Sequence, residues 1–319
     1  QDSDGHDLDL TTIAVSAGAN TVGVDAASPT VEINTLEVFS NNIGAHRNSP
    51  IIYGLGDLND DGFDDFAVAP FKTSDPGQIH IVLGRLNSGT LEDSIDIDEI
   101  HSHKTTVFND LGTNGFGASI ALATSLTSQN SKDLIVYEEG NGGSYGSYPS
   151  SAYILPFVEI EASLVDGGAS LSTIGRVKIT DLQGGVNVGA VTGDFNGDGN
   201  PDLHLGSHEA VTQGRSHFIE SAGQFTIGET ISVYNLTSAN GFNTQGGESS
   251  GDLTAAFFQG DIDADGFDEL VVGGYNHDPN GHLSGQVFLV WGTDNYQTGT
   301  TYDLHNTTDA RWTIIDGPQ

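Results

Sequence analysis

Three acidic segments carry oxygen-bearing side chains at one repeated spacing. In each, they fill positions 1, 3, 5 and 9 of a nine-residue stretch: Asp57, Asn59, Asp61 and Asp65; Asp194, Asn196, Asp198 and Asp202; Asp261, Asp263, Asp265 and Glu269. A glycine follows position 5 each time and allows the chain to bend sharply around an ion. Position 7 can add its backbone carbonyl, at Phe63, Asn200 and Phe267. Oxygen ligands without Cys, His or Met favour Ca²⁺ over zinc or copper, so we expect three calcium sites.

Two other interpretations fit part of this pattern. An EF-hand begins with the same D-x-[DN]-x-D-G pattern, but it needs a bidentate Glu at position 12. The chain has Val68, Leu205 and Val272 there, between flanks that read as strands, which argues against an EF-hand. An acidic turn without an ion is the simpler alternative, because Asp, Asn and Gly favour turns. Its recurrence at three places favours the calcium interpretation.

A fourth, degenerate copy lies at ATSLTSQNSKDLIVYEE, from Ala123 onward. Here Ser125, Thr127 and Gln129 replace the oxygen ligands, and only Asp133 keeps its charge. We therefore expect no Ca²⁺ at residues 125–133. Asn130 replaces the glycine and can still adopt the left-handed conformation of the bend. Lys132 either acts as the counter-charge of Asp133 in place of the ion or stays unpaired on the surface.

These loops belong to a repeat of roughly 68 residues, which indicates a repeat architecture. Each loop is followed by a Gly-led run of alternating apolar residues, as at 77–83 and 285–291. A further short β-type run follows at 105–108, 176–179 and 312–315. Each unit therefore reads as four strands separated by glycine-rich turns.

Four-stranded units at this period predict an all-β fold, a β-propeller whose blades bury their faces against one another. We expect a single domain over residues 1–319, with repeat units at 40–110, 111–181, 182–250 and 251–319. Residues 1–39 add a partial or closing unit, with strands expected at 10–15, 31–33 and 36–39. The number of blades stays open. The missing Met and the loop-like residues at both ends favour a processed form or part of a larger chain or assembly.

The sequence resembles the FG-GAP repeats of integrin α-subunit propellers and their bacterial relatives. The resemblance rests on Phe116-Gly117 and on GDLNDDGFDDFAV, GDFNGDGNPDLHLGS and GDIDADGFDELVVGG, and it covers roughly residues 36–319. It implies calcium between the first two strands of a blade, at the rim away from the ligand-binding face. It also implies extracellular adhesion or ligand binding, or a module of a secreted enzyme. The chain departs from the pattern before Gly44 and Gly189, where no Phe stands, and in its degenerate loop.

The composition of the chain limits the kinds of molecule that it is expected to bind. Asp and Glu number 44 against 9 Lys and Arg, a formal net charge of −35, which repels nucleic acid and anionic lipid. No apolar stretch approaches the length of a membrane span, so membrane insertion is not expected. Abundant Asp with little Lys favours a secreted, extracellular or cell-surface protein in salt or divalent cation, which screens the repulsion. The partner expected is an extracellular protein or carbohydrate.

No reaction can be named from the sequence. It has no Gly-x-Ser-x-Gly, P-loop or HExxH motif, and the histidine pairs 204 and 208, 101 and 103, and 277 and 282 read as surface or packing residues. We expect a non-catalytic, calcium-stabilised binding or adhesion module. The alternatives are a Ca²⁺-dependent polysaccharide lyase or hydrolase on the same scaffold, and a structural part of a surface filament or adhesin.

Ligand binding is assigned to Tyr145 and Tyr148 in the segment EEGNGGSYGSY. Tyrosine rings bind sugars or peptides at modest entropic cost. A flexible linker between strands is the alternative interpretation of this segment. Asn235 and Asn306 each begin a glycosylation sequon, a motif that also occurs by chance.

Overall fold

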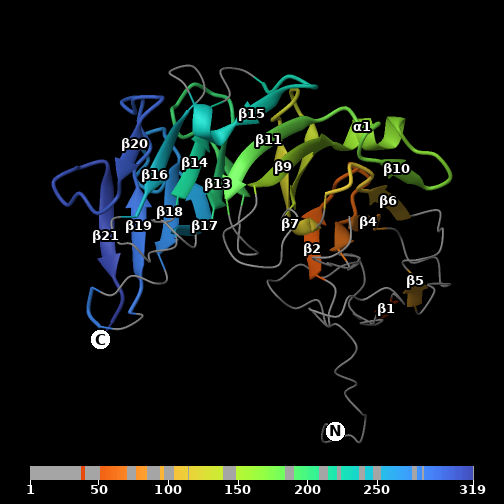
Figure 1. Ribbon diagram of the computed structural model, residues 1–319, viewed down its shortest axis with the longest axis horizontal. Coiled ribbons are helices and arrows are strands. Elements are labelled where there is room, and N and C mark those ends of the chain that lie inside the picture. The colour runs from red at the N-terminus through yellow and green to blue at the C-terminus, as the bar shows by residue number, and fades with distance from the viewer. Residues whose placement is uncertain are drawn as a thin grey trace, which may run out of the picture.

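The computed structural model describes residues 37–39, 51–69, 77–84, 94–96, 104–113, 115–138, 149–183, 190–207, 215–220, 224–236, 241–246, 253–274, 279–281 and 284–318. Strands dominate this part of the chain (Figure 1). The helices found within it are short: α1 (Phe157–Ala162) and the 3₁₀ turn η1 (Val233–Asn235). Neither approaches the length and apolar character of a membrane-crossing helix. The predicted all-β class is confirmed.

Four antiparallel meanders follow one another along the chain. The first sheet contains β2 (Ile51–Gly56), β3 (Asp65–Ala69), β4 (Gln78–Val82) and β6 (Lys104–Phe108). The second contains β7 (Phe116–Thr124), β8 (Lys132–Glu138), β9 (Pro149–Pro156) and β11 (Val177–Gln183). The third contains β12 (Ala190–Gly193), β13 (Asp202–Ser207), β14 (Arg215–Ile219) and β16 (Phe242–Gln245). The fourth contains β17 (Leu253–Gly260), β18 (Glu269–Gly274), β19 (Gln286–Val290) and β21 (Trp312–Asp316).

In each meander, a short extra strand lies in the connection before the last strand. It pairs with the last strand of the preceding unit and not with its own sheet. These strands are β5 (Ser94–Asp96), β10 (Gly168–Ser170), β15 (Thr230–Ser232) and β20 (Thr301–Asp303). They run parallel to β1 (Glu37–Phe39), β6, β11 and β16 respectively. The first three sheets therefore have five strands each, not the expected four. The sequence missed these strands because three residues are too few to show a period.

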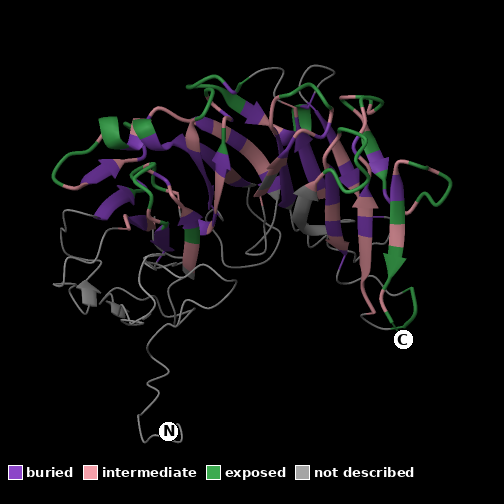
Figure 2. Cartoon of the chain, turned by 180° about the vertical axis from the view of Figure 1, so that it is seen from behind, coloured by how far each residue is buried: buried purple, intermediate pink, exposed green. Residues whose placement is uncertain are grey.

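The sheets stand side by side along an arch, without closing a ring in the described part of the chain (Figure 1). Their first strands contact one another in sequence: β2 contacts β7, β7 contacts β12, and β12 contacts β17. One apolar cluster fills each space between neighbouring sheets. Leu55, Ile79 and Phe116 belong to the first, Ile135 and Leu203 to the second. Phe218 and Phe288 belong to the third. Figure 2 shows burial concentrated in the sheets and exposure in the connections.

Phe116-Gly117 has a clear packing role. The Phe116 ring is fully buried between the first two sheets, with its centroid 6.0 Å from that of Tyr153. Gly117 has a φ of 89°, and a Cβ there would lie 2.9 Å from Ile79 Cγ2 and 3.0 Å from Ala69 Cβ. Only glycine fits both the backbone conformation and this close approach. The pair therefore lets neighbouring sheets approach closely.

Candidate calcium-binding loops

The three acidic loops occupy the same place in their sheets. Each joins the first strand to the second: residues 57–64 between β2 and β3, 194–201 between β12 and β13, and 261–268 between β17 and β18. The degenerate loop joins β7 to β8 in the second sheet. In the three acidic loops the position 9 carboxylate is the first residue of the second strand, where it is buried, while the earlier acidic positions are partly or fully exposed.

One hydrogen-bonding scheme holds all three acidic loops. In the first, the N–H of Asp61 donates to Asp57 Oδ1 at 3.0 Å and to Asn59 Oδ1 at 3.2 Å. The N–H of Gly62 donates to Asp57 Oδ2 at 2.9 Å, and that of Phe63 to Asp61 Oδ1 at 2.9 Å. These bonds turn the oxygens of positions 1, 3 and 5 toward the inside of the bend.

The second and third loops repeat these bonds. The N–H groups of Asp198 and Asp265 donate to the position 1 carboxylates, Asp194 and Asp261, both at 3.0 Å. The N–H groups of Gly199 and Gly266 donate to the same carboxylates at 2.9 and 3.0 Å. The N–H groups of Asp198 and Asp265 also donate to the side chains of position 3, Asn196 and Asp263, at 3.0 and 3.2 Å. The N–H groups of position 7, Asn200 and Phe267, donate to the carboxylates of position 5 at 2.8 and 3.0 Å. The predicted side chains of positions 1, 3 and 5 are thus brought together in each loop.

Two positions of every acidic loop have left-handed backbone. The predicted bend glycines, Gly62, Gly199 and Gly266, have φ values of 92°, 86° and 96°. Position 4 is also left-handed, with φ of 57° at Asp60, 72° at Gly197 and 62° at Ala264. The sequence did not reveal this second position because three different residue types occupy it.

The third loop has the strongest fit to a cation. Ligand oxygens of Asp261, Asp263 and Asp265 lie within 4.8 Å of one another on the surface. Glu269 at position 9 is fully buried, and its Oε2 accepts the N–H of Ile262 at 2.6 Å. Its Oε1 accepts no hydrogen bond of normal geometry, although the N–H of Gly292 lies near the carboxylate. A buried carboxylate oxygen without a partner is costly unless a cation or donor satisfies it. The donor set is all oxygen, as Ca²⁺ prefers.

Burial also shifts the pKa of two position 9 carboxylates, Asp65 and Glu269. Desolvation raises the pKa of Asp65, and the N–H groups of Gly84 and Leu58 oppose the rise by donating at 2.7 Å each. Desolvation likewise raises the pKa of Glu269, against the N–H groups of Ile262 and Gly292. Neighbouring aspartates raise both pKa values further. A cation in the loop would oppose these effects by stabilising the ionised carboxylate.

The degenerate loop satisfies its one remaining carboxylate internally. Asp133 is fully buried and accepts the N–H of Leu126 at 2.9 Å, the hydroxyl of Thr127 at 2.6 Å and the hydroxyl of Ser131. Asn130 has a φ of 61°, which confirms its expected left-handed conformation. Hydroxyl groups here contact the carboxylate in the way that a cation would in the acidic loops.

Both sequence-based interpretations of Lys132 are wrong. It is neither the counter-charge of Asp133 nor unpaired, because its Nζ lies 3.4 Å from Oδ1 of Asp60 in the first loop. The degenerate loop and the first loop are thus neighbours on adjacent sheets. Asp268 was missed in the same way: it follows position 7 of the third loop, yet its Oδ2 accepts the N–H of Asp194 at 2.8 Å. No spacing rule within one repeat could find a contact between two repeats.

The other candidate residues gain no site. Tyr145 and Tyr148 lie outside the described residues, as do His101, His103, His208, His277 and His282. His204 is fully buried, with neither ring nitrogen hydrogen bonded. Its ring packs against Phe218 at a centroid distance of 6.0 Å. This is the packing role expected from the sequence.

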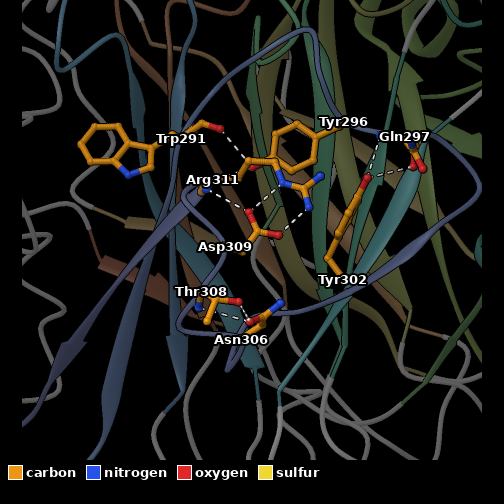
Figure 3. A network of polar contacts seen from close by, with 8 residues as sticks. All are labelled: Trp291, Tyr296, Gln297, Tyr302, Asn306, Thr308, Asp309 and Arg311. Carbon is orange, nitrogen blue, oxygen red and sulfur yellow. Dashed lines mark hydrogen bonds and ion pairs between the residues drawn. The ribbon is translucent and has the colours of Figure 1, made fainter.

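The side chain of Arg311 fills an aromatic cluster between the third and fourth sheets. Figure 3 shows Arg311 between Tyr296 and Tyr302, its guanidinium carbon 5.5 and 4.3 Å from their ring centroids. Asp309 accepts from Arg311 Nε at 2.9 Å and from Nη2. The Tyr296 hydroxyl donates to the carbonyl of Trp291 at 3.0 Å. The chain's own arginine therefore fills this cluster, which fixes the start of β21.

Comparison with known proteins assigns no family to this chain. Neither a scan against protein-family models nor a search of curated proteins gives a match. A functional assignment must therefore come from the loops themselves.

Proposed function

We propose that this chain is a calcium-stabilised β-propeller module of the FG-GAP type, which works outside the cell and binds a protein or glycan ligand without catalysis. The observation that carries the proposal is the third loop. There, three surface carboxylates converge within 4.8 Å beside a buried Glu269 oxygen that accepts no hydrogen bond of normal geometry. Like charges at such distances repel by about 1 kcal/mol per pair even in water, and by more near a protein surface.

In this proposal each acidic loop holds one Ca²⁺ ion. The ligands are the side chains of positions 1, 3, 5 and 9 and the carbonyl of position 7, which is Phe63, Asn200 or Phe267. The bound ion supplies positive charge that offsets the repulsion among the carboxylates. The chain's own part is to preorganise the oxygens, through the N–H groups that fix Asp57, Asp194 and Asp261. An ion bound only by the folded chain stabilises it by linkage, about 2.7 kcal/mol per site at 100-fold excess over Kd.

The meanders are the proposed blades. Successive contacts of β2, β7, β12 and β17 support this, since the first strand of each blade lines the centre of a propeller. Each short extra strand then joins one blade to the next. Residues 37–39 contribute the last strand of a further unit, since β5 pairs with β1 as β10 pairs with β6.

Charge and topology support the proposed extracellular location and the proposed place of the ligand surface. A chain with a formal charge of −35 is better screened where salt and calcium are abundant. The strand β8 starts at the degenerate loop and ends at Glu138, so the connection that carries Tyr145 and Tyr148 leaves the opposite end of the sheet. We place the ligand surface at that end, away from the calcium loops.

Calorimetric titration of the metal-free protein with Ca²⁺ tests the proposal. We expect three sites, reduced to two by Asp263→Asn combined with Asp265→Asn, and a melting temperature that falls on addition of a chelator. Asp303→Asn removes an exposed carboxylate outside the loops and serves as the matched control. Absence of calcium binding at millimolar concentration would refute the calcium sites. Binding to a glycan array, compared between wild type and Tyr145→Ala with Tyr148→Ala, tests the ligand surface separately.

A further inference from the structure

One glycosylation sequon lies in a surface turn of the fourth sheet. Asn306-Thr307-Thr308 stands in the connection between β20 and β21, and all three residues are exposed. The carbonyl of Asn306 accepts the N–H of Asp309 at 3.1 Å, which closes the turn. Asparagine followed two residues later by Ser or Thr is the acceptor sequence of N-linked glycosylation, which modifies surface positions. The turn meets both conditions.

The side chains of this sequon are arranged around the asparagine amide. Oδ1 of Asn306 accepts the hydroxyl of Thr308 at 2.6 Å and the N–H of the same residue at 3.2 Å (Figure 3). Among the described residues no hydrogen bond uses Nδ2 of Asn306. The amide oxygen is therefore engaged, whereas the amide nitrogen, the atom that a sugar would join, is free.

The second sequon of the chain, Asn235-Leu236-Thr237, differs at the same two points. Nδ2 of Asn235 donates to Oγ of Ser232 at 3.2 Å. Leu236 is only 8% exposed and belongs to the apolar cluster between the second and third sheets. Modification of Asn235 would disturb that hydrogen bond and bring a bulky group next to a core residue. We therefore expect Asn235 to stay unmodified.

The turn around Asn306 is anchored on both sides. Before it, Leu304 is fully buried and its N–H donates to the carbonyl of Gln245 at 3.0 Å. After it, Nε of Arg311 donates to Asp309 at 2.9 Å. Because these anchors do not involve Nδ2 of Asn306, a glycan on that atom would displace no hydrogen bond among the described residues.

We propose that Asn306 is an N-linked glycosylation site, which carries an oligosaccharide delivered from a lipid-diphosphate-linked donor. The inference rests on the extracellular location in the proposed function, since this modification belongs to secreted proteins. In the transfer, Nδ2 forms a bond to C1 of the first sugar, the bond from C1 to the phosphate oxygen breaks, and the lipid diphosphate leaves. Nδ2 loses one proton. The two hydrogen bonds to Oδ1 stabilise the negative charge that develops on that oxygen as the proton leaves.

The site is separate from the calcium ligands. β20 ends at Asp303, next to the end of β16 that lies opposite the calcium-type loops. β21 begins at Trp312, which pairs with Val290 near the third loop. The turn at 306–309 lies in the connection between these two points. Glycosylation and calcium binding can therefore be tested independently.

Peptide mass spectrometry of the protein purified from the cells that make it is the first test. Cleavage before aspartate puts the two sequons in different peptides, residues 303–308 (DLHNTT) and residues 202–251. We expect the added mass of an oligosaccharide on the first peptide and none at Asn235 in the second. Electron-transfer fragmentation should place the sugar on Asn306 and not on Thr307 or Thr308.

Transfer in vitro tests the turn itself. The folded protein is incubated with a purified oligosaccharyltransferase and a lipid-diphosphate-linked oligosaccharide. Asn306→Gln keeps an amide and Thr308→Val keeps the shape of the side chain, and each should abolish the transfer. Thr308→Ser keeps the hydroxyl and should be modified. Asn235→Gln is the matched control and should be modified as wild type is.

Three results would overturn the proposal: an unmodified 303–308 peptide in the native protein, no transfer to the folded protein in vitro, or transfer that persists in Asn306→Gln. Calcium titration of Asn306→Gln should match that of wild type. A failure of glycosylation would therefore leave the proposed calcium sites standing, and absence of calcium binding would leave the glycosylation result unchanged.

Discussion

Asp268 and Asp194 form two hydrogen bonds with each other, which join the third acidic loop to the second. The N–H of Asp268 donates to the carbonyl of Asp194 at 2.9 Å, and the N–H of Asp194 donates to Asp268 Oδ2 at 2.8 Å. Glycine at 193 makes room, since a Cβ there would lie 2.7 Å from the same oxygen. Asp194 is position 1 of the second loop, and Asp268 adjoins Glu269 of the third. The two proposed sites therefore share a backbone link.

Asp268→Ala should uncouple the two sites. With the link intact, removing the third site by Asp263→Asn with Asp265→Asn should also lower the calcium affinity of the second. In the Asp268→Ala background, which keeps only the backbone bond, that indirect effect should become smaller, and a double-mutant cycle of calorimetric affinities measures the change. Loss of the side-chain bond should also cost about 1 kcal/mol of stability in chelator. Asp268→Asn keeps an oxygen acceptor and is the control. If removing the third site leaves the calcium affinity of the second site unchanged in the wild-type background, the two sites are not coupled.

Lys132 should weaken calcium binding in the first loop. Its Nζ lies 3.4 Å from Asp60, within the loop that would hold the ion, so it adds positive charge beside the site. Lys132→Gln should therefore raise the calcium affinity of the first loop at low ionic strength, and salt should reduce the gain because Asp60 is 75% exposed. Stability in chelator should change by less than about 1 kcal/mol, as for other surface ion pairs. Lys178→Gln, a charge change on β11, is the comparison. An affinity gain that persists in 1 M salt would show a different cause.

Asp133 should matter for folding and not for calcium. Asp133→Ala would leave the N–H of Leu126 and the hydroxyls of Thr127 and Ser131 without their buried acceptor. We expect a loss of roughly 3 kcal/mol, equal with calcium and with chelator, in denaturant unfolding. Asp261→Ala should show a different pattern, with a larger loss of stability in calcium than in chelator. If the cost of Asp133→Ala depended on calcium, the degenerate loop would itself be binding the ion.

The sequence predicted what each repeat does by itself. Alternating apolar residues located β4, β6, β11, β19 and β21, and the bend pattern located the left-handed position of Asn130, because these depend on residues close in the chain. Phe116-Gly117 was recognised as a motif, although its reason, the close approach of Ile79 to Gly117, needs two sheets in place.

Contacts between repeats were not predicted from the sequence. The bonds of Asp268 to Asp194 and of Lys132 to Asp60 join different units, and neither pair has a fixed spacing within one. The extra strands were missed for the same reason: Thr230–Ser232 is too short to show alternation, and its partner β11 belongs to the preceding unit. The predicted ligand-binding residues, Tyr145 and Tyr148, lie outside the described residues, so this prediction stays untested.

Two buried histidines of the third sheet should make the fold sensitive to acid. Burial lowers the pKa of His204 to about 3, with a smaller effect of His217 in the same direction. Burial also lowers the pKa of His217 to about 4, although Asn243 opposes this through a contact of 2.7 Å to Nδ1. In the unfolded chain both have their ordinary pKa near 6.5. Unfolding below that pH therefore takes up protons that the folded state does not bind.

The sign of the effect follows from the lowered pKa values. The stability is fully present above pH 6.5, where both histidines are neutral in either state, and it is lost as the pH falls from 6.5 toward 4 and 3. At pH 5 each histidine should cost about 2 kcal/mol. His204→Phe should remove its share, so the loss of unfolding free energy between pH 7 and pH 5 should shrink by about 2 kcal/mol. His305→Phe alters a histidine that is only partly buried, and should not reproduce this change. An equal loss in wild type and His204→Phe would show that His204 is protonated in the fold, and that its burial does not control the acid response.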